Sequence, residues 1–422
     1  MQLHPEDTQL DIARAWLREL QERAVNTVLQ GSNRPLVTDA ALVALDQIVR
    51  FTPTKDQNLV RRGVFKYRRE SEISRIARAK SIICHVAPGP FEDPIYFAIL
   101  AYQAASVEMA YEGLYQKRPI PVDFSKFLLG TLHFPLVNAF ADKITKTPYT
   151  IVVIFSALID FFYQAAKAVV EAVNPLMSTD PRSSVVVNFD PEVIRTRLDS
   201  DSRSAERLYQ TLRGYFVDGK ARASAGEIIP QEHYPVLSLL VGMAERWTIA
   251  HEYGHGLAPS FERVPPTVNP VRTEEYFADR HATIATVFSA ASLDSVPPEI
   301  PLGGAIFTLA CLDILQKSRS ILQTGKETSS DAEQGTHPEP VSRAAEVINC
   351  FRQFFDVHYY PDKGFDLKLL LRKEVPKTHE FSREHSERAY KYANVLWILW
   401  KPVKERLLEN RHNMQLHPVW RL

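Results

Sequence analysis

The chain has 422 residues, of which 45% are hydrophobic and 24% charged, as is typical of a soluble globular protein with at least one large core. Lysine plus arginine and aspartate plus glutamate each number 50, and this balance argues against a dedicated nucleic-acid binder. The cysteines Cys84, Cys311 and Cys350 are far apart and lack metal-ligand spacing, which argues against a disulfide framework and favours a cytoplasmic location.

The first part of the chain, residues 1–178, is predicted to be helical. Its opening residues contain no basic stretch followed by an apolar one, so no secretory signal is expected. Apolar residues then recur at three- and four-residue steps, which is the spacing of an amphipathic helix. Residues 55–80 are basic; the interleaved glutamates favour a solvated helix face, and a site for phosphate or an acidic partner is the alternative.

The most apolar run of the chain extends from Tyr149 to Tyr163. A helix that spans a bilayer needs about 20 mostly apolar residues, whereas this run contains Asp160 and is soon followed by Lys167. We therefore expect a buried core helix here, with a membrane-associated helix as the alternative. Farther along, residues 185–189 are predicted to form a short buried strand.

The motif that points to chemistry is His251-Glu252-Tyr-Gly-His255, at the end of a long helical pattern. Residues four apart lie on one face of a helix, so both imidazoles can reach one ion. Neutral imidazole suits zinc, which it binds at about 2.0–2.1 Å. Glu252 is then placed to accept a proton from water and to deliver it to a leaving amine. Two histidines that lie four apart by chance are the alternative.

A third ligand is needed, because catalytic zinc sites usually have three protein ligands and a water. A metzincin arrangement is excluded, since neither the glycine nor the histidine that it needs follows the motif at the set spacing. A second helical pattern at 273–280 instead places Glu275 and Asp279 on one face. Glu275 can bind the ion while Asp279 accepts a hydrogen bond from a ligand imidazole, and Glu274 is a competitor for the ligand role.

Three further segments are interpreted as structural. His281 follows Asp279 by two residues and is turned away from the metal face of a helix, so it is predicted to be structural or exposed. Tyr253 is predicted to pack rather than to line a substrate cleft. The polar segment from Thr324 to Pro340 is predicted to be a loop.

Together these motifs resemble the gluzincin clan of zinc metallopeptidases, the thermolysin-like group. The form Glu-x-x-Ala-Asp-Arg, beginning at Glu275, is most similar to the HtpX and CAAX-prenyl endopeptidase family. His337-Pro338 followed by Arg343 is similar to a segment of that family and of the phage-exclusion Lit peptidases. The resemblance implies a catalytic role for His337, or a place for Arg343 at the oxyanion or substrate carbonyl.

The resemblance covers about a quarter of the chain and implies a zincin-like core. We therefore predict a predominantly α, α+β protein with a zincin-like metallopeptidase core and a small sheet at 179–345, and C-terminal helices over 346–422. One Zn²⁺ is expected at the metal ligands His251, His255 and Glu275. Members of the HtpX type normally have several membrane spans, so a membrane-protein substrate is not carried over.

The predicted function is hydrolysis of peptide bonds in a protein or peptide substrate, with no nucleic-acid partner. One rival is a catalytically inactive, zinc-stabilised protein-interaction module, which the intact Glu252 argues against, because a structural zinc site needs no base. A second rival is a toxin-like or defence protease that a partner activates. The sequence does not separate this rival from a housekeeping enzyme.

Overall fold

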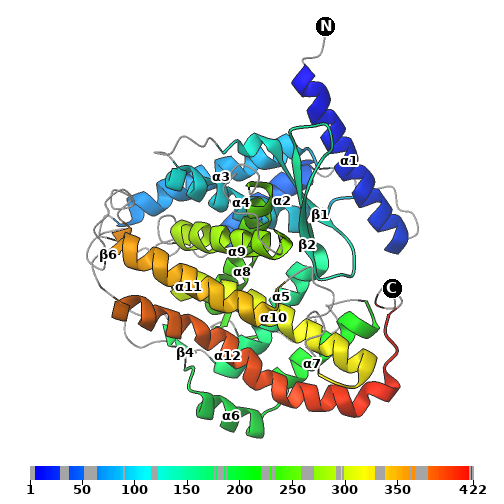
Figure 1. The fold of residues 1–422 in the computed structure, drawn as a ribbon, viewed down its shortest axis with the longest axis vertical. Coiled ribbons are helices and arrows are strands. Elements are labelled where there is room, and N and C mark those ends of the chain that lie inside the picture. Colours follow the sequence, from blue (N-terminus) through cyan, green and yellow to red (C-terminus); the bar gives the residue numbers. More distant parts are fainter. Residues whose placement is uncertain are drawn as a thin grey trace.

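The structure, a computed structural model, is predominantly helical with small β-sheets (Figure 1). It describes residues 5–28, 38–51, 64–88, 91–115, 122–174, 176–177, 185–186, 188–219, 229–230, 233–257, 270–290, 296, 299–327, 338–360, 364–365, 379–417 and 420. The helices are α1 (Pro5–Val28), α2 (Thr38–Phe51), α3 (Val64–Val86), α4 (Pro94–Tyr115), α5 (Ser156–Val173), α6 (Pro191–Ser200), α7 (Arg203–Val217), α8 (Tyr234–Leu257), α9 (Pro270–Ser289), α10 (Glu299–Thr324), α11 (Pro340–His358) and α12 (His379–Asn410).

The main sheet has three strands in the order β1-β3-β2. Its strands are β1 (Phe127–Leu132), β2 (Ala139–Lys143) and β3 (Thr150–Phe155). β1 runs parallel to the central strand β3, and β2 runs antiparallel to it. Two short antiparallel pairs lie elsewhere: β4 (Leu176–Met177) with β5 (Val185–Val186), and β6 (Tyr359–Tyr360) with β7 (Gly364–Phe365).

The position of this sheet corrects the prediction for the apolar run from Tyr149 to Tyr163. Its first part is the fully buried strand β3, and helix begins only at Ser156. The run Thr-Ile-Val-Val-Ile is rich in β-branched residues, which favour strands. Because both faces of β3 are buried, the strand has no polar alternation, and its pattern could not be told from that of a buried helix. The region predicted to be helical therefore contains the main sheet.

Helix α8 carries the histidine motif and lies in the centre of the molecule. It contacts α4, α5, α9 and α10, and it also contacts β2 and β3. Nearly all of its side chains from Leu240 to Tyr253 are buried, including the charged Arg246. Arg246 donates hydrogen bonds to Gln103 Oε1 (3.1 Å) and Ser289 Oγ (3.2 Å), which satisfy part of its buried guanidinium. The helix is thus fixed on several sides.

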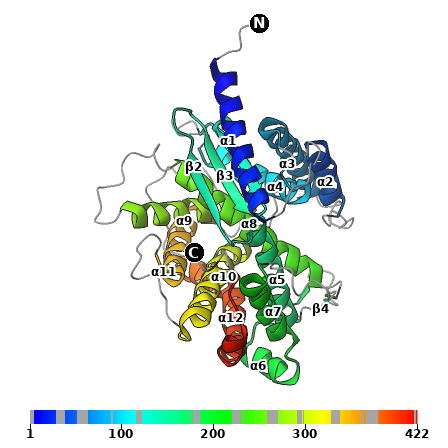
Figure 2. The ribbon, with the colours of Figure 1, turned by 90° about the vertical axis from the view of Figure 1, so that its right-hand side faces the viewer.

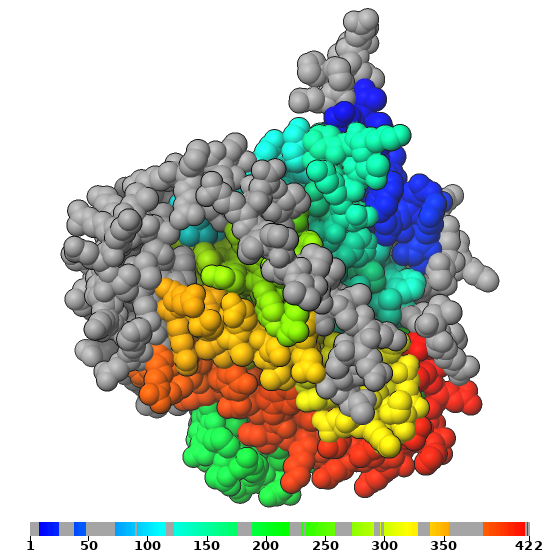
Figure 3. Space-filling view, in the orientation of Figure 1, coloured from blue at the N-terminus to red at the C-terminus, as the bar shows by residue number. Residues whose placement is uncertain are grey.

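One continuous hydrophobic core links the N-terminal, central and C-terminal parts of the chain. At one edge of the sheet, α1 packs against β1 (Figure 2). There the Glu92 carboxylate accepts a hydrogen bond from Thr131 N (2.9 Å), and the Gln21 amide donates a hydrogen bond to Thr131 O (3.0 Å). At the other end, α12 packs against α10 and α11. In the space-filling view α11 and α12 form adjacent bands on one face (Figure 3).

Among the described residues, α10 is the one helix long and apolar enough to cross a membrane. Of the most apolar 18-residue stretch of this helix, 78% is buried inside the protein, as in the core helix of a globular domain.

Candidate metal centre

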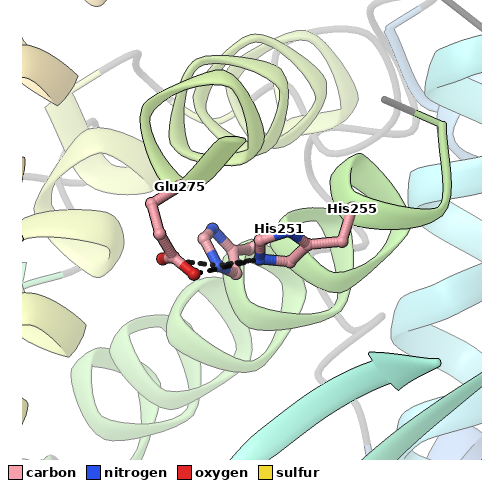
Figure 4. A group of neighbouring side chains, drawn as sticks. All are labelled: His251, His255 and Glu275. Atoms are coloured by element: carbon pink, nitrogen blue, oxygen red, sulfur yellow. Dashed lines mark hydrogen bonds and ion pairs between the residues drawn. The ribbon is translucent and has the colours of Figure 1, made fainter. Parts of the chain in front are cut away.

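Three side chains from two helices converge on one point: His251 and His255 from α8 and Glu275 from α9 (Figure 4). The two Nε2 atoms are 3.1 Å apart. Glu275 Oε2 lies 3.6 Å from His251 Nε2, and Oε1 lies 3.4 Å from His255 Nε2. Ligands at about 2.0–2.1 Å from a tetrahedral ion are about 3.3–3.4 Å from one another. The distances to Glu275 involve a different oxygen for each histidine, and one ligand atom from each of the three residues lies within 4.8 Å of the others, so the three side chains are close enough to hold one metal ion.

The close crossing of α8 and α9 depends on Gly254, which lies inside the motif. A Cβ atom at Gly254 would be 2.8 Å from Ala278 Cα and 3.2 Å from Ala278 Cβ, well inside van der Waals contact. Without that atom the helices can approach closely enough for Glu275, about one turn before Ala278, to face both imidazoles. The sequence interpretation missed this residue, although a glycine inside a helix is itself a signal of close packing.

Each imidazole also has a carboxylate on its other nitrogen. Asp279 Oδ1 lies 3.0 Å from His251 Nδ1, and Glu274 Oε1 lies 3.1 Å from His255 Nδ1. The Glu274 contact is a hydrogen bond, which keeps the proton on Nδ1 of His255 and turns its Nε2 lone pair toward the centre, whereas Asp279 lies close to His251 Nδ1 without hydrogen-bond geometry. Glu274, which was a candidate metal ligand, therefore lies behind His255, whereas Glu275 faces the Nε2 atoms of both histidines.

Arg343 of α11 is the cation of this cluster and is buried. Its guanidinium donates two hydrogen bonds to Asp279, from Nη2 to Oδ1 (2.7 Å) and from Nε to Oδ2 (2.8 Å). Nη1 lies 3.3 Å from Glu275 Oε2. Burial opposes ionisation of Asp279, but Arg343 and His251 outweigh it and hold the pKa of Asp279 below its ordinary value. Arg343, which was expected near a substrate carbonyl, is engaged here by carboxylates of its own chain.

Glu252 is buried beside the first ligand. Burial raises the pKa of its carboxyl, while the nearby His251 and His255 act in the opposite direction. A carboxyl with a raised pKa is a better proton acceptor than a solvated one, as general-base chemistry requires.

Trp247 fixes the ring of His251 from one turn before it. The two rings are stacked, with centroids 5.4 Å apart. Trp247 Nε1 donates to Thr283 Oγ1 (3.3 Å), and that hydroxyl donates to the Asp279 carbonyl (2.7 Å). The sequence interpretation assigned Trp247 to the apolar side of the helix, and nothing in the sequence links it to Thr283.

The structural interpretations of two neighbouring residues are confirmed. His281 lies against the rings of Tyr111 and Phe277, and burial lowers its pKa to about 4. Tyr253 is buried, and its hydroxyl donates to Glu108 Oε1 (3.1 Å). His337, the candidate catalytic residue of the polar loop, lies outside the described residues.

The described cluster holds more buried carboxyl groups than buried guanidinium groups. Glu252, Glu275 and Asp279 are three buried carboxyl groups, and Arg343 is one buried guanidinium. Burial lowers the pKa of His255, but its contacts with Glu275, Glu252 and Glu274 outweigh burial and raise the pKa to about 9, so that a proton on His255 compensates part of the negative charge in the absence of a metal. A divalent cation at the three ligand atoms would take the place of that proton.

No protein-family model, no curated protein and no solved structure matches the chain.

Proposed function

We propose that the protein is a zinc-dependent endopeptidase with a zincin-like core, in which His251, His255 and Glu275 hold the ion. The observation that carries the proposal is the convergence of two Nε2 atoms and one carboxylate, with one ligand atom from each residue within 4.8 Å of the others. The three buried carboxyl groups of the cluster, with one buried guanidinium among them, also support it, because they favour a cation at this place.

The donor set favours zinc over other divalent ions. Mg²⁺ and Ca²⁺ prefer oxygen ligands, whereas two imidazoles and one carboxylate are a common set in catalytic zinc sites. Three protein ligands leave a fourth coordination position for solvent or substrate, which a structural zinc site would fill with another side chain. The donor set therefore suits catalysis better than structural stabilisation.

A zinc ion supplies Lewis acidity, which polarises a peptide carbonyl and makes water more acidic. Glu252 accepts the proton of the attacking water and passes it to the leaving amine. Glu274 keeps His255 in the tautomer whose Nε2 faces the centre, and a metal at His251 Nε2 would replace the present contact of that atom with Arg343 Nη2 (3.4 Å). Arg343 balances the buried carboxylates of Asp279 and Glu275, so that ionised carboxylates are stable inside the protein.

The sheet next to α8 is suited to an extended peptide. β1 has its outer edge at Thr131 covered by Glu92 and Gln21. β2, at the other edge, contacts α8 and is half-buried to exposed, and no described strand pairs with its outer side. An unpaired strand edge can bind an extended chain through main-chain hydrogen bonds. This arrangement supports a peptide rather than a compact small molecule as the substrate.

The test combines metal analysis with loss of the base. Elemental analysis of the purified protein should find about one zinc per chain in the wild type and in Glu252→Gln, and none in His255→Ala. His281→Ala is the matched control, because it removes a neighbouring partly buried imidazole from outside the cluster and should keep the metal.

Terminal-peptide profiling in cells that express the wild type or Glu252→Gln then tests catalysis. New protein termini should appear with the wild type alone. Equal biological activity of both proteins would instead favour the zinc-stabilised interaction module. A wild-type protein purified without chelators that holds no metal would refute the proposal.

A further inference from the structure

The two imidazoles of the candidate metal centre are held in different ways. Glu274 forms a hydrogen bond with Nδ1 of His255, whereas Nδ1 of His251 is buried and bonds no described group. The Asp279 carboxylate lies beside His251 but takes two hydrogen bonds from Arg343, which set the plane of that carboxylate. The orientation of the His251 ring therefore depends on a further neighbour.

That neighbour is Trp247, which lies one turn before His251 on α8. The two rings are stacked, with centroids 5.4 Å apart and 24° between their planes. Trp247 is 2% exposed, so its indole is surrounded by packed side chains and has little freedom to tilt. A stacked ring restrains the imidazole only as far as the indole itself is fixed.

Thr283 of α9 fixes the indole. Trp247 Nε1 donates a hydrogen bond to Thr283 Oγ1 (3.3 Å), and the same hydroxyl donates to the Asp279 carbonyl one turn earlier (2.7 Å). A hydroxyl has one hydrogen, so a threonine that donates to Asp279 can only accept from the indole. Both bonds are buried and both have a defined direction.

The hydrogen bond between Trp247 and Thr283 is also a second point at which α8 and α9 are joined. The first point is the close approach of Gly254 to Ala278. The two points lie about two turns apart along α8. One point of contact leaves two helices free to rotate about it, whereas two points fix their relative direction. The bond thus holds both the ring of His251 and the helix that carries Glu275.

We propose that Trp247 and Thr283 are positioning residues, which orient His251 toward the metal through the hydrogen bond between them. The inference rests on the proposed metal centre and goes beyond it, because it assigns the orientation of one ligand to a bond between two residues that do not touch the ion. Packing of the indole alone, without the bond, is the alternative.

The experiment compares the zinc affinities of full-length variants by titration against a competing chelator. Thr283→Val keeps the shape of the side chain and removes the acceptor, and it should weaken zinc binding about tenfold, at the lower end of the range for groups that orient metal ligands. Trp247→Phe keeps an aromatic ring beside His251 but loses the N–H, and it should have a similar effect. Thr283→Ser retains a hydroxyl and should recover most of the affinity.

The double variant separates the hydrogen bond from two independent packing effects. If both residues act through the bond, Trp247→Phe combined with Thr283→Val should bind zinc about as weakly as either single variant, whereas independent losses would multiply to about 100-fold. The visible absorption of Co²⁺ bound in place of zinc reports the geometry of the ligands. It should change in Thr283→Val and return in Thr283→Ser, which a loss of stability alone would not produce.

Thr286→Val is the matched control. Thr286 is a buried threonine of the same helix, and its hydroxyl bonds no described group. This variant should keep the zinc affinity and the Co²⁺ spectrum of the wild type.

The inference is overturned if the wild type binds zinc and folded Thr283→Val binds it equally well. It is also overturned if Thr283→Val and Thr286→Val lose affinity alike, or if the losses multiply in the double variant. A wild type that binds neither zinc nor Co²⁺ would instead remove the metal centre itself, and this inference with it, so the two failures are told apart.

Discussion

Replacement of Gly254 by alanine tests whether the close crossing of α8 and α9 creates the candidate metal centre. The new Cβ would lie 2.8 Å from Ala278 Cα, 3.2 Å from Ala278 Cβ and 3.3 Å from Ala278 O. Carbon atoms are comfortable at about 3.5–4.0 Å, so the helices must separate locally by about 0.7 Å or more. Glu275 would move with α9, and its oxygens now lie 3.4 and 3.6 Å from the two Nε2 atoms. A shift of that size would lengthen both distances to about 4 Å or more, well beyond the spacing of about 3.3–3.4 Å between two ligands of one tetrahedral ion.

The energies decide how the variant should behave. Overpacking typically costs about 1–3 kcal/mol, while alanine in a helix gains about 0.5–1 kcal/mol over glycine. The net loss of folding stability should therefore be about 0–2.5 kcal/mol, and most of the protein should remain folded. Zinc binding should weaken much more visibly, by about 10- to 100-fold, as is usual when the geometry of a ligand shell is disturbed.

The assay is zinc titration against a competing chelator, with thermal unfolding of the same samples. Gly242→Ala is the matched control in the same helix, because its Cβ would meet only the end of the Gln103 side chain, at 3.1 Å, and no backbone atom of α9. This control should bind zinc like the wild type. The reasoning is refuted if folded Gly254→Ala binds zinc with wild-type affinity, or if both alanine variants lose affinity equally.

Three further outcomes follow from the buried charges. Removal of the metal by a chelator should lower the Tm of the protein. The difference should grow with the ratio of free zinc concentration to Kd in the zinc-containing reference sample. A Tm that does not respond to zinc would contradict a resident ion. Asp279→Asn should weaken zinc binding about 10- to 100-fold in the chelator assay, because the carboxylate next to Nδ1 of His251 is removed. Unchanged zinc affinity would show that this carboxylate does not orient His251. Burial raises the pKa of Glu108 from its usual 4.5 to about 7. The native state therefore binds this proton more tightly than the unfolded state does. The resulting contribution to folding stability is fully present below pH 4.5 and is lost as the pH rises through 7. Glu108→Gln should therefore remove a fall of about 3 kcal/mol in the free energy of unfolding between pH 4.5 and 8, measured by urea unfolding, and an unchanged pH profile would count against it.

The parts of the candidate metal centre that lie within one helix could be predicted from the sequence, because they depend on helix geometry alone. Residues four apart face the same side, so the relation of His251 to His255 and that of Glu275 to Asp279 were readable before any fold was known. Strand β3 was misread for the converse reason: a short apolar run that is buried on both faces has no periodicity that separates strand from helix.

What the sequence by itself determined is the chemistry of the candidate ligands and the helix that carries each set. Only the tertiary structure decided which carboxylate meets which imidazole, because Glu274 and Glu275 are adjacent in the sequence. The crossing of α8 with α9 places Glu274 beside Nδ1 of His255 and turns Glu275 toward the Nε2 atoms. It also decided that Arg343, distant in sequence, pairs with Asp279. Local spacing is set by the backbone of one helix, whereas contacts between helices depend on side-chain packing across the whole core.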